Sequence, residues 1–154
     1  MLVGCFALIL FRRDLHTISF FIGNMVCEAV NMIFKYIIKE PRPFVRPFQY
    51  TDYGMPSSHS QMVWFFALYA TFFVLFRLHH NRESIFEAIW KASIIAAVFC
   101  IASVVVYSRV YLLYHSWAQV IVGSVLGAVL GVGWFFIVHV HLTPLFPQIA
   151  SWSI

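Results

Sequence analysis

Three short stretches of the sequence carry side chains of the kinds that bind and transfer phosphate groups. Each lies at the end of a long apolar run, and together they supply two histidines, three cations and two serines. The residues are Lys35 and Arg42, then Ser57, Ser58 and His59, then Arg109 and His115. A charged group at a membrane boundary costs free energy, so its presence there indicates a functional site. Two imidazoles with three fixed cations can carry out phosphoryl transfer when no metal ion is present.

The first stretch places two cations near the end of an expected helix. Lys35 and Arg42 are seven residues apart, about two helical turns, so a continued helix would put them on one face. Pro41 ends that helix, so Arg42 lies just past its end, where the guanidinium can turn toward an oxyanion. Lys35 alone could also be an interfacial anchor. Lys39 and Arg46 fit better as such anchors or as lipid contacts.

The second stretch, residues 54–59, predicts a turn that leads into an apolar helix. Serine is a preferred N-cap, and the free N–H groups at a helix start bind anions. We therefore expect Ser57 and Ser58 to hold phosphate oxygens, with His59 close to the leaving group. A purely structural histidine after a serine cap is the alternative.

The third stretch joins two apolar runs. Arg109 ends one run and His115 begins the next, so both side chains can point into a shared opening. His115 and Gln119 are four residues apart, on one face of a helix. The amide carbonyl can accept a hydrogen bond from one imidazole nitrogen and leave the other as a nucleophile. An interfacial histidine is the alternative interpretation of His115.

No pattern in the sequence predicts a metal or another cofactor. His79 and His80 are adjacent and lack a third ligand at helical spacing, and His139 and His141 fit an interfacial position. There is no HExxH motif, phosphate-binding P-loop or dinucleotide glycine pattern. The three cysteines lie in apolar segments without paired spacing, so we expect them to be small buried apolar residues.

The composition is that of a polytopic membrane protein. The 154 residues have a mean hydropathy of +0.84, with 62% hydrophobic and 10% charged residues, whereas soluble domains have about 25% charged residues. Each span needs roughly 20 apolar residues, so the length allows four to five. We expect an all-α transmembrane bundle in a single domain, 1–154, with spans near 17–38, 59–76, 92–107 and 117–140. The apolar stub 1–11 is too short to span, which predicts truncation at the N-terminus.

Charge placement constrains the partners and the topology. The net charge is +4 without a basic run, which favours anionic lipids or an anionic substrate over nucleic acid. Counting spans places the loop after Lys35 and the link after Arg109 on one membrane face. Raw counts of Lys and Arg are equal on the two faces, so the positive-inside rule is indecisive. If the cations on the face of Lys35 and Arg109 bind substrate, the cations on the opposite face become the cytoplasmic signal. The site then faces the lumen or the exterior.

Three glycines in the last span predict close helix packing. Gly123, Gly127 and Gly131 recur at four-residue intervals, a spacing that lets helices approach closely. The stripe could pack against another helix of the same chain or form a homodimer face.

The three stretches resemble the signature of the phosphatidic acid phosphatase type 2 superfamily, whose pattern is K-x6-RP, PSGH and SR-x5-H-x3-D. Here it appears as Lys35 with Arg42-Pro43, Pro56-Ser57-Ser58-His59, and Ser108-Arg109 with His115. Ser58 replaces a glycine and Gln119 replaces the final aspartate. Both differences are similar to the branch of the family that acts on dolichyl diphosphate, as are the phrases GMPSSHSQ, EPRP, YSRVYLLYH and LTPLFP.

The resemblance implies a haloperoxidase-like bundle and a role for each residue. His115 would attack phosphorus and form a phosphohistidine, while His59 would protonate the leaving group and then assist water. The equatorial oxygens would be held by Lys35, Arg42 and Arg109, with backbone N–H groups near Ser57 and Ser58. The physical interpretation agrees, because positioning and charge stabilisation make up most of phosphoryl transfer.

Gln119 would orient His115 but brings no charge. A neutral amide cannot stabilise an imidazolium as a carboxylate does, a difference on the order of one to a few kcal/mol. Glu28, Glu40 and Asp52 are the acidic residues that could substitute for the missing carboxylate.

The resemblance also implies a substrate and a place in the cell. The reaction would be hydrolysis of dolichyl diphosphate to dolichyl phosphate and phosphate, which recycles the lipid carrier for protein N-glycosylation. The membrane would be that of the endoplasmic reticulum, with the site facing the lumen. The competing hypotheses are a broader lipid phosphate phosphatase, a membrane protein that binds lipid phosphate without turnover, and a proton or anion pathway.

Overall fold

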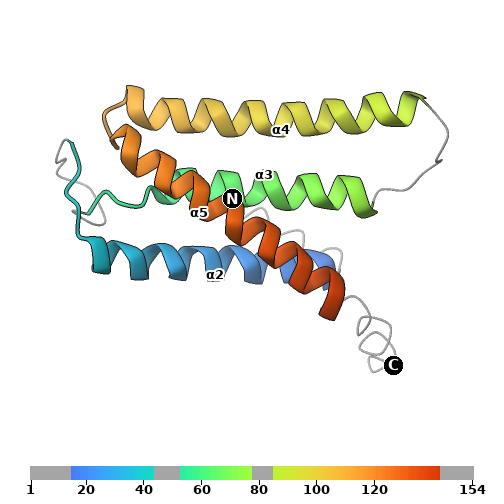
Figure 1. Ribbon diagram of the computed structural model, residues 1–154, viewed down its shortest axis with the longest axis horizontal. Helices are drawn as coiled ribbons and strands as arrows, with labels where there is room; N and C mark the ends of the chain where they lie inside the picture. The colour runs from blue at the N-terminus through green and yellow to red at the C-terminus, as the bar shows by residue number, and fades with distance from the viewer. Residues whose placement is uncertain (1–14, 44–52, 78–84, 143–154) are drawn as a thin grey trace.

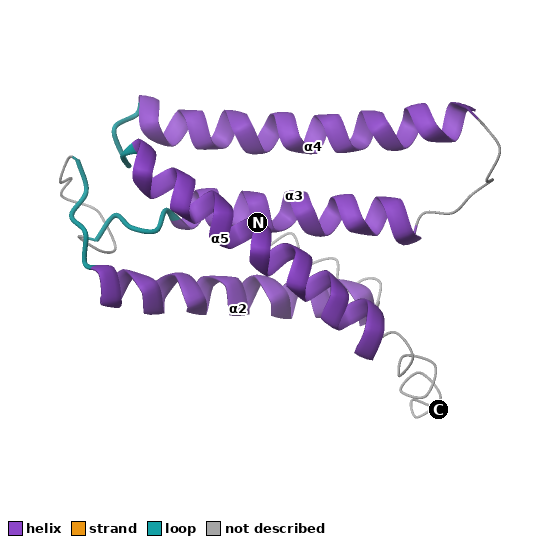
Figure 2. Cartoon of the chain, viewed as in Figure 1, coloured by secondary structure: helices purple, strands orange, loops and turns teal. Residues whose placement is uncertain are grey.

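The computed structural model describes residues 15–43, 53–77 and 85–142, which form four long helices (Figure 1). The helices are α2, Leu15–Ile38; α3, Ser58–Arg77; α4, Ile85–Tyr111; and α5, Trp117–Ile137. A π-helical turn, η1, Val138–Leu142, continues α5. All four helices are long and apolar enough to cross a membrane. The described part of the chain contains no strand, only an isolated bridge between Pro41 and Tyr53 (Figure 2). The expected all-α membrane bundle is confirmed.

Helix α4 is longer than the expected span 92–107. It begins at Ile85, whereas the hydropathy pattern placed the start of the span near residue 92. Glu87 and Lys91 form an ion pair one helical turn apart, so polar residues assigned to the preceding connection belong to the helix. The four-residue spacing of Glu87 and Lys91 therefore locates the start of α4 better than hydropathy does. The stub 1–11 lies outside the described residues.

Backbone contact between α3 and α5 forms the centre of the bundle. A Cβ added to Gly123 would lie 2.6 Å from the carbonyl oxygen of Ser57, and one added to Gly131 would lie 2.5 Å from that of Phe65. The middle member, Gly127, would overlap the carbonyl oxygen of Gln61. Both helices thus contribute residues at four-residue intervals, and only glycine permits this approach.

The glycine stripe therefore packs inside the chain. Gly123, Gly127 and Gly131 are all buried, and α3 covers the face that they share. The alternative use of this stripe, as a homodimer face, is corrected here because the face has no room for a second copy.

Helix α4 lies at the side of the bundle (Figure 1). Ala102 is its buried residue, and most of its apolar side chains are exposed, as expected for a surface in contact with lipid. One contact with α3 is the edge-to-face pair Trp64 and Phe99, with ring centroids 5.4 Å apart.

Candidate active site

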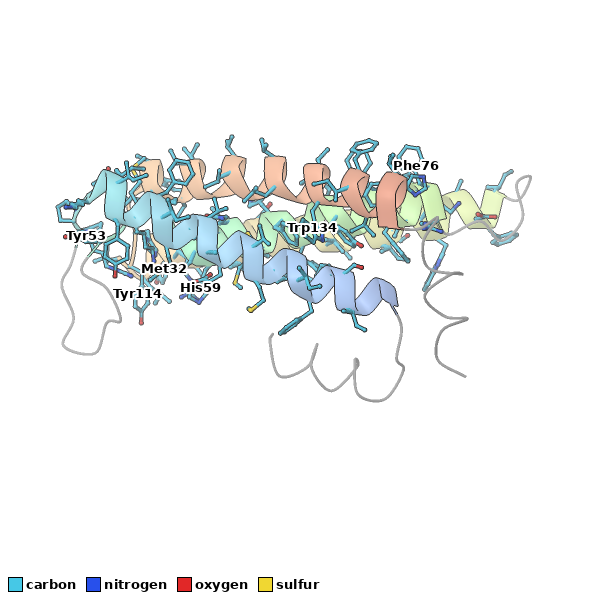
Figure 3. The ribbon with its side chains drawn as sticks, turned by 90° about the horizontal axis from the view of Figure 1, so that it is seen from below. Met32, Tyr53, His59, Phe76, Tyr114 and Trp134 are labelled. Carbon is cyan, nitrogen blue, oxygen red and sulfur yellow. The ribbon has the colours of Figure 1, made fainter. Side chains whose placement is uncertain are left out.

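The predicted site residues gather at one end of the bundle. The end of α2, the start of α3, the end of α4 and the start of α5 meet there, because successive helices run in opposite directions (Figure 1). Figure 3 shows Tyr53, His59 and Tyr114 at this end and Phe76 at the other. Three turns and loops that are distant in sequence thus share one opening.

The two cation-bearing helices end in the same way. Lys39 follows α2 with φ 53°, and its N–H donates to the carbonyl of Lys35 at 3.0 Å. Leu113 follows α4 with φ 55°, and the N–H of Tyr114 donates to the carbonyl of Arg109 at 3.0 Å. These are left-handed C-terminal caps, formed here without glycine. Each cap places its cation in the last turn of the helix.

The charges of the site act on both histidines. Lys35 is only 4% exposed, and its charge and that of Arg42 reach the imidazoles of His59 and His115. Arg109 also acts on His59. Five groups from three sequence stretches therefore share one electrostatic environment, as the spacing predicts.

The side chain of Arg109 has a second contact that restricts its position. Its guanidinium carbon lies 5.4 Å from the ring centroid of Tyr114, within the range of a cation–π interaction. The carbonyl of Arg109 also accepts from the N–H of His115 at 3.3 Å. The cation and the buried imidazole are thus linked through the same short turn.

The turn before α3 is held by buried polar groups. The amide of Asn31 donates to the side-chain oxygen of Gln61 at 2.6 Å and to the carbonyl of Pro56 at 3.3 Å. The amide of Gln61 in turn donates to the carbonyl of Cys27 at 2.8 Å. This network fixes the turn against α2, and the buried Asn31 is a supporting residue that sequence analysis missed.

Ser57, one of the predicted phosphate ligands, makes its contacts within the protein. Ser57 is fully buried, its N–H donates to the carbonyl of Gln119 at 3.2 Å, and its hydroxyl contacts that of Ser60 at 3.1 Å. Ser57 therefore anchors the turn to α5, and its own N–H is already engaged. Ser58 and the exposed His59 stand at the first turn of α3, where backbone N–H groups lack intrahelical acceptors.

His115 is held in a single tautomer. It is 3% exposed, and its Nδ1 lies 2.9 Å from the carbonyl oxygen of Gly54 and 3.2 Å from Oε1 of Gln119. Both partners are acceptors, so Nδ1 carries the proton and Nε2 keeps its lone pair. Gly54 makes this possible, because an added Cβ would lie 2.5 Å from Oε1 of Gln119.

Burial keeps this imidazole neutral. Burial, followed by the charge of Arg42, lowers the pKa of His115 to about 4, although the hydrogen bonds to Gln119 and Gly54 act in the opposite direction. At neutral pH the side chain is therefore an uncharged base with a free nitrogen, as a nucleophile requires.

Gln119 also belongs to a capping box that begins α5. Its N–H donates to Oγ of Ser116, and Oε1 accepts from the N–H of Ser116, each at 3.3 Å. The signal was present in the sequence, because serine followed three residues later by glutamine is a capping-box pattern. The box places Gln119 one turn beyond His115 and fixes its side chain.

Among the described residues, no group of three or more histidine, cysteine, aspartate or glutamate side chains is arranged to hold a metal ion.

Comparison with known proteins gives the family. Residues 16–142 match the family model described as the PAP2 superfamily. The chain belongs to the PAP2 superfamily. This confirms the family expected from the three motifs, whose histidines and cations the fold brings to one end.

Curated members of the PAP2 superfamily share much of the sequence. "Dolichyldiphosphatase 1" of Mus musculus is 46% identical over the whole chain, which covers 66% of that protein. "Dolichyldiphosphatase" of Saccharomyces cerevisiae is 36% identical, with 83% of the chain and 54% of that protein covered. "Lipid phosphate phosphatase gamma" of Arabidopsis thaliana is 36% identical, with 91% and 61% covered. The chain thus spans about two thirds or less of the length of these relatives. No solved structure matches it.

Proposed function

We propose that the chain is a single transmembrane phosphatase domain that hydrolyses dolichyl diphosphate to dolichyl phosphate and phosphate. The observation that carries the proposal is the state of His115, whose Nδ1 donates to carbonyl oxygens while Nε2 keeps its lone pair beside fixed cations. Relatives named dolichyldiphosphatase in a mammal and in yeast support the choice of substrate.

The first step forms a phosphohistidine. Nε2 of His115 attacks the terminal phosphorus, the bond from phosphorus to the bridging oxygen breaks, and His59 gives its proton to the departing dolichyl phosphate. Lys35, Arg42 and Arg109 stabilise the charge on the equatorial oxygens, which is the largest contribution that a protein makes to phosphoryl transfer. Gln119 and the carbonyl of Gly54 hold the imidazole as it becomes positively charged.

The second step releases phosphate. His59, now neutral, takes a proton from water, whose oxygen attacks phosphorus and breaks the bond to Nε2 of His115. Phosphate leaves, and both histidines return to their starting states. The exposed position of His59 supports this role, because the group must reach both the leaving oxygen and water.

An apolar groove supports a substrate with a long apolar tail. A cavity of about 490 Å³ lies between α3, α4 and α5, and its lining is almost entirely apolar. It begins beside the site, because Tyr107 precedes Ser108 and Arg109, while Trp117 follows His115 closely. We propose that the isoprene units next to the diphosphate lie in this groove. The lining residues are Trp64, Ser103, Val106, Tyr107, Trp117, Ile121, Ser124, Val125 and Ala128.

The proposal includes a location. We place the chain in the endoplasmic reticulum membrane with the site toward the lumen, where dolichyl phosphate is recycled for N-glycosylation. The placement is supported by the helix ends, since Arg77 and Lys91 lie on the opposite side of the bundle from the site and could serve as the cytoplasmic charge signal.

A broader lipid phosphate phosphatase is the second candidate. The relative named lipid phosphate phosphatase gamma supports it. The groove would accept acyl chains as well as prenyl chains, so the head group rather than the tail distinguishes the two candidates.

The deciding experiment is phosphate release by the reconstituted chain in EDTA. We expect release from dolichyl diphosphate, little from phosphatidic acid, and loss of a phosphoenzyme trapped by acid quench in His115→Ala. Comparable release from both lipids would favour the second candidate. Undiminished release by His115→Ala would overturn the mechanism, and no release by the folded chain would favour lipid binding without turnover.

A further inference from the structure

We infer that Glu40 is a positioning residue for His115 and acts on it through the side-chain amide of Gln119. The inference rests on the proposed function, because it assigns the means by which the nucleophile is held. Three side chains form one chain of hydrogen bonds, from Glu40 in the loop after α2 to Gln119 in α5 to His115 in the turn before α5.

The amide of Gln119 has one possible orientation. Its Nε2 donates to the carboxylate of Glu40 at 2.8 Å and to the carbonyl of Pro41 at 2.9 Å, which uses both hydrogens. Its Oε1 accepts from the N–H of Ser116 at 3.3 Å and faces Nδ1 of His115. In a flipped amide, the oxygen would face the two acceptors, Glu40 and Pro41, and the NH₂ group would face the N–H donor of Ser116. The carboxylate of Glu40 therefore fixes which end of the amide meets the imidazole.

A second route from Glu40 reaches the same nitrogen. The carbonyl of Glu40 accepts from the N–H of Gly54 at 2.7 Å, and the carbonyl of Gly54 lies 2.9 Å from Nδ1 of His115. The left-handed Lys39 turns the chain so that carbonyl and carboxylate of the next residue both face this region. Glu40 thus supports both acceptors of Nδ1, one through its backbone and one through its side chain.

The carboxylate also supplies charge that the amide lacks. Hydrogen bonds in a poorly solvated network polarise one another, so a carboxylate behind Nε2 makes Oε1 a stronger acceptor. The imidazolium formed with the phosphohistidine gains most from this, because its Nδ1–H is the stronger donor. Of the three acidic residues that could compensate for Gln119, Glu40 is the one hydrogen-bonded to it, and Asp52 lies outside the described residues.

The test compares Glu40→Gln with Glu87→Gln. The first keeps the shape and an acceptor oxygen but removes the charge, whereas the second removes a charge from the start of α4 and is the matched control. In the full reconstituted chain we expect kcat on dolichyl diphosphate to fall about ten- to hundredfold in Glu40→Gln, as for a lost charge-assisted hydrogen bond, with KM unchanged. Glu87→Gln should keep wild-type kinetics.

A double-mutant cycle separates action through Gln119 from direct action on substrate. Removing the Glu40 charge in a Gln119→Ala background should cost less than twofold, because the connection is already broken. Additive losses would overturn the inference, as would an unchanged kcat in Glu40→Gln.

A readout independent of turnover completes the test. In protein with ¹⁵N-labelled histidine, the ring-nitrogen shifts of His115 report which nitrogen is protonated. We expect the Nδ1–H form in both the wild type and Glu40→Ala, because the carbonyl of Gly54 still accepts from Nδ1 in the variant, but a Nδ1 shift in Glu40→Ala that reports a weaker hydrogen bond. An inactive wild type would count against the proposed function alone, whereas an unchanged Nδ1 shift in Glu40→Ala would count against the inference alone.

Discussion

The two helices that deliver the third motif are held in opposite ways. Helix α5 touches the backbone of α3 through a glycine stripe, and its first turn begins with a capping box beside His115. Helix α4 has Ala102 as its buried residue and exposes most of its apolar side chains, yet its last turn carries Arg109. The proposed nucleophile thus stands in the turn just before the fixed helix, and a cation stands in the last turn of the peripheral one.

The difference corresponds to what each group must do. An attacking nitrogen must be placed to within a fraction of an ångström, and close-packed backbones provide that. A guanidinium can reach its anion with a long side chain, so its helix can be less constrained. Only the short turn from Arg109 to His115 needs to be accurate, and a left-handed cap fixes that turn.

The largest effect should come from filling the α3–α5 contact. In Gly127→Val the new side chain would overlap the carbonyl oxygen of Gln61, and backbone cannot move aside as a side chain can. We expect a loss of about 3 kcal/mol in the free energy of unfolding, measured by denaturant titration in detergent micelles.

The matched control lies on the same helix. No atom would lie within 4 Å of a Cβ at Gly133, so Gly133→Val should unfold as the wild type does. Equal losses in the two variants would mean that valine itself, rather than the contact with α3, destabilises α5.

The start of α5 should also make stability depend on pH. The pKa of His115 falls from 6.5 in the unfolded chain to about 4 in the folded one. Between these values the unfolded state binds more protons, so stability is complete above pH 6.5 and declines as the pH falls toward 4. The change is on the order of 3 kcal/mol.

Unfolding measured from pH 7.5 to 4 would check this, with His115→Gln as the comparison. In this variant, the free energy of unfolding should depend less steeply on pH, because the contribution of His115 is absent. A slope that stays the same would show that other groups, His59 among them, account for the acid sensitivity.

Filling the groove between α3, α4 and α5 should weaken substrate binding and leave the chemical steps unchanged. Ala128 lines it, so Ala128→Phe should fill it and raise KM for dolichyl diphosphate about tenfold, which is roughly 1.4 kcal/mol of lost apolar contact. Isopentenyl diphosphate, whose tail is too short to enter far, should be hydrolysed with unchanged constants.

Val129→Phe is the control, because this neighbour is 64% exposed and does not line the groove. If it raises KM as much as Ala128→Phe does, the prenyl chain lies elsewhere on α5.

The smallest effect should come from the lipid-facing side of α4. Val104 is 62% exposed, so Val104→Ala should change the free energy of unfolding by less than about 0.5 kcal/mol. Ala102→Leu, two residues away at the buried position, should cost about 1 to 3 kcal/mol through overpacking. Similar values for both variants would contradict the peripheral placement of α4.

Much of this arrangement could be predicted from residue spacing. Long apolar runs predict the helices, and the three motifs at their ends predict a shared site, because helices that alternate in direction bring alternate connections to one side. The glycine interval predicted a close contact but not its partner, since sequence alone does not say which helix lies opposite Gly127.

What the sequence could not predict are contacts that depend on the assembled fold. The N–H of Ser57 donates to the carbonyl of Gln119, a residue far away in sequence. Choosing Glu40 over Glu28 and Asp52 likewise required the turn at Lys39, which no local pattern indicates in a non-glycine residue. Tertiary geometry, rather than propensity, decides such pairs.

The two left-handed caps fix the distance along the chain between each cation and the end of its helix. Each lies four residues beyond a cation, Lys35 in α2 and Arg109 in α4, and terminates the helix behind it. One residue inserted between a cation and its cap would rotate that cation by about 100° and move it about 1.5 Å along the axis. An insertion directly after either cap would displace the group that follows it, Arg42 beyond Lys39 and His115 beyond Leu113. The intervals from Lys35 to Arg42 and from Arg109 to His115 should therefore keep their length in relatives that share the proposed reaction.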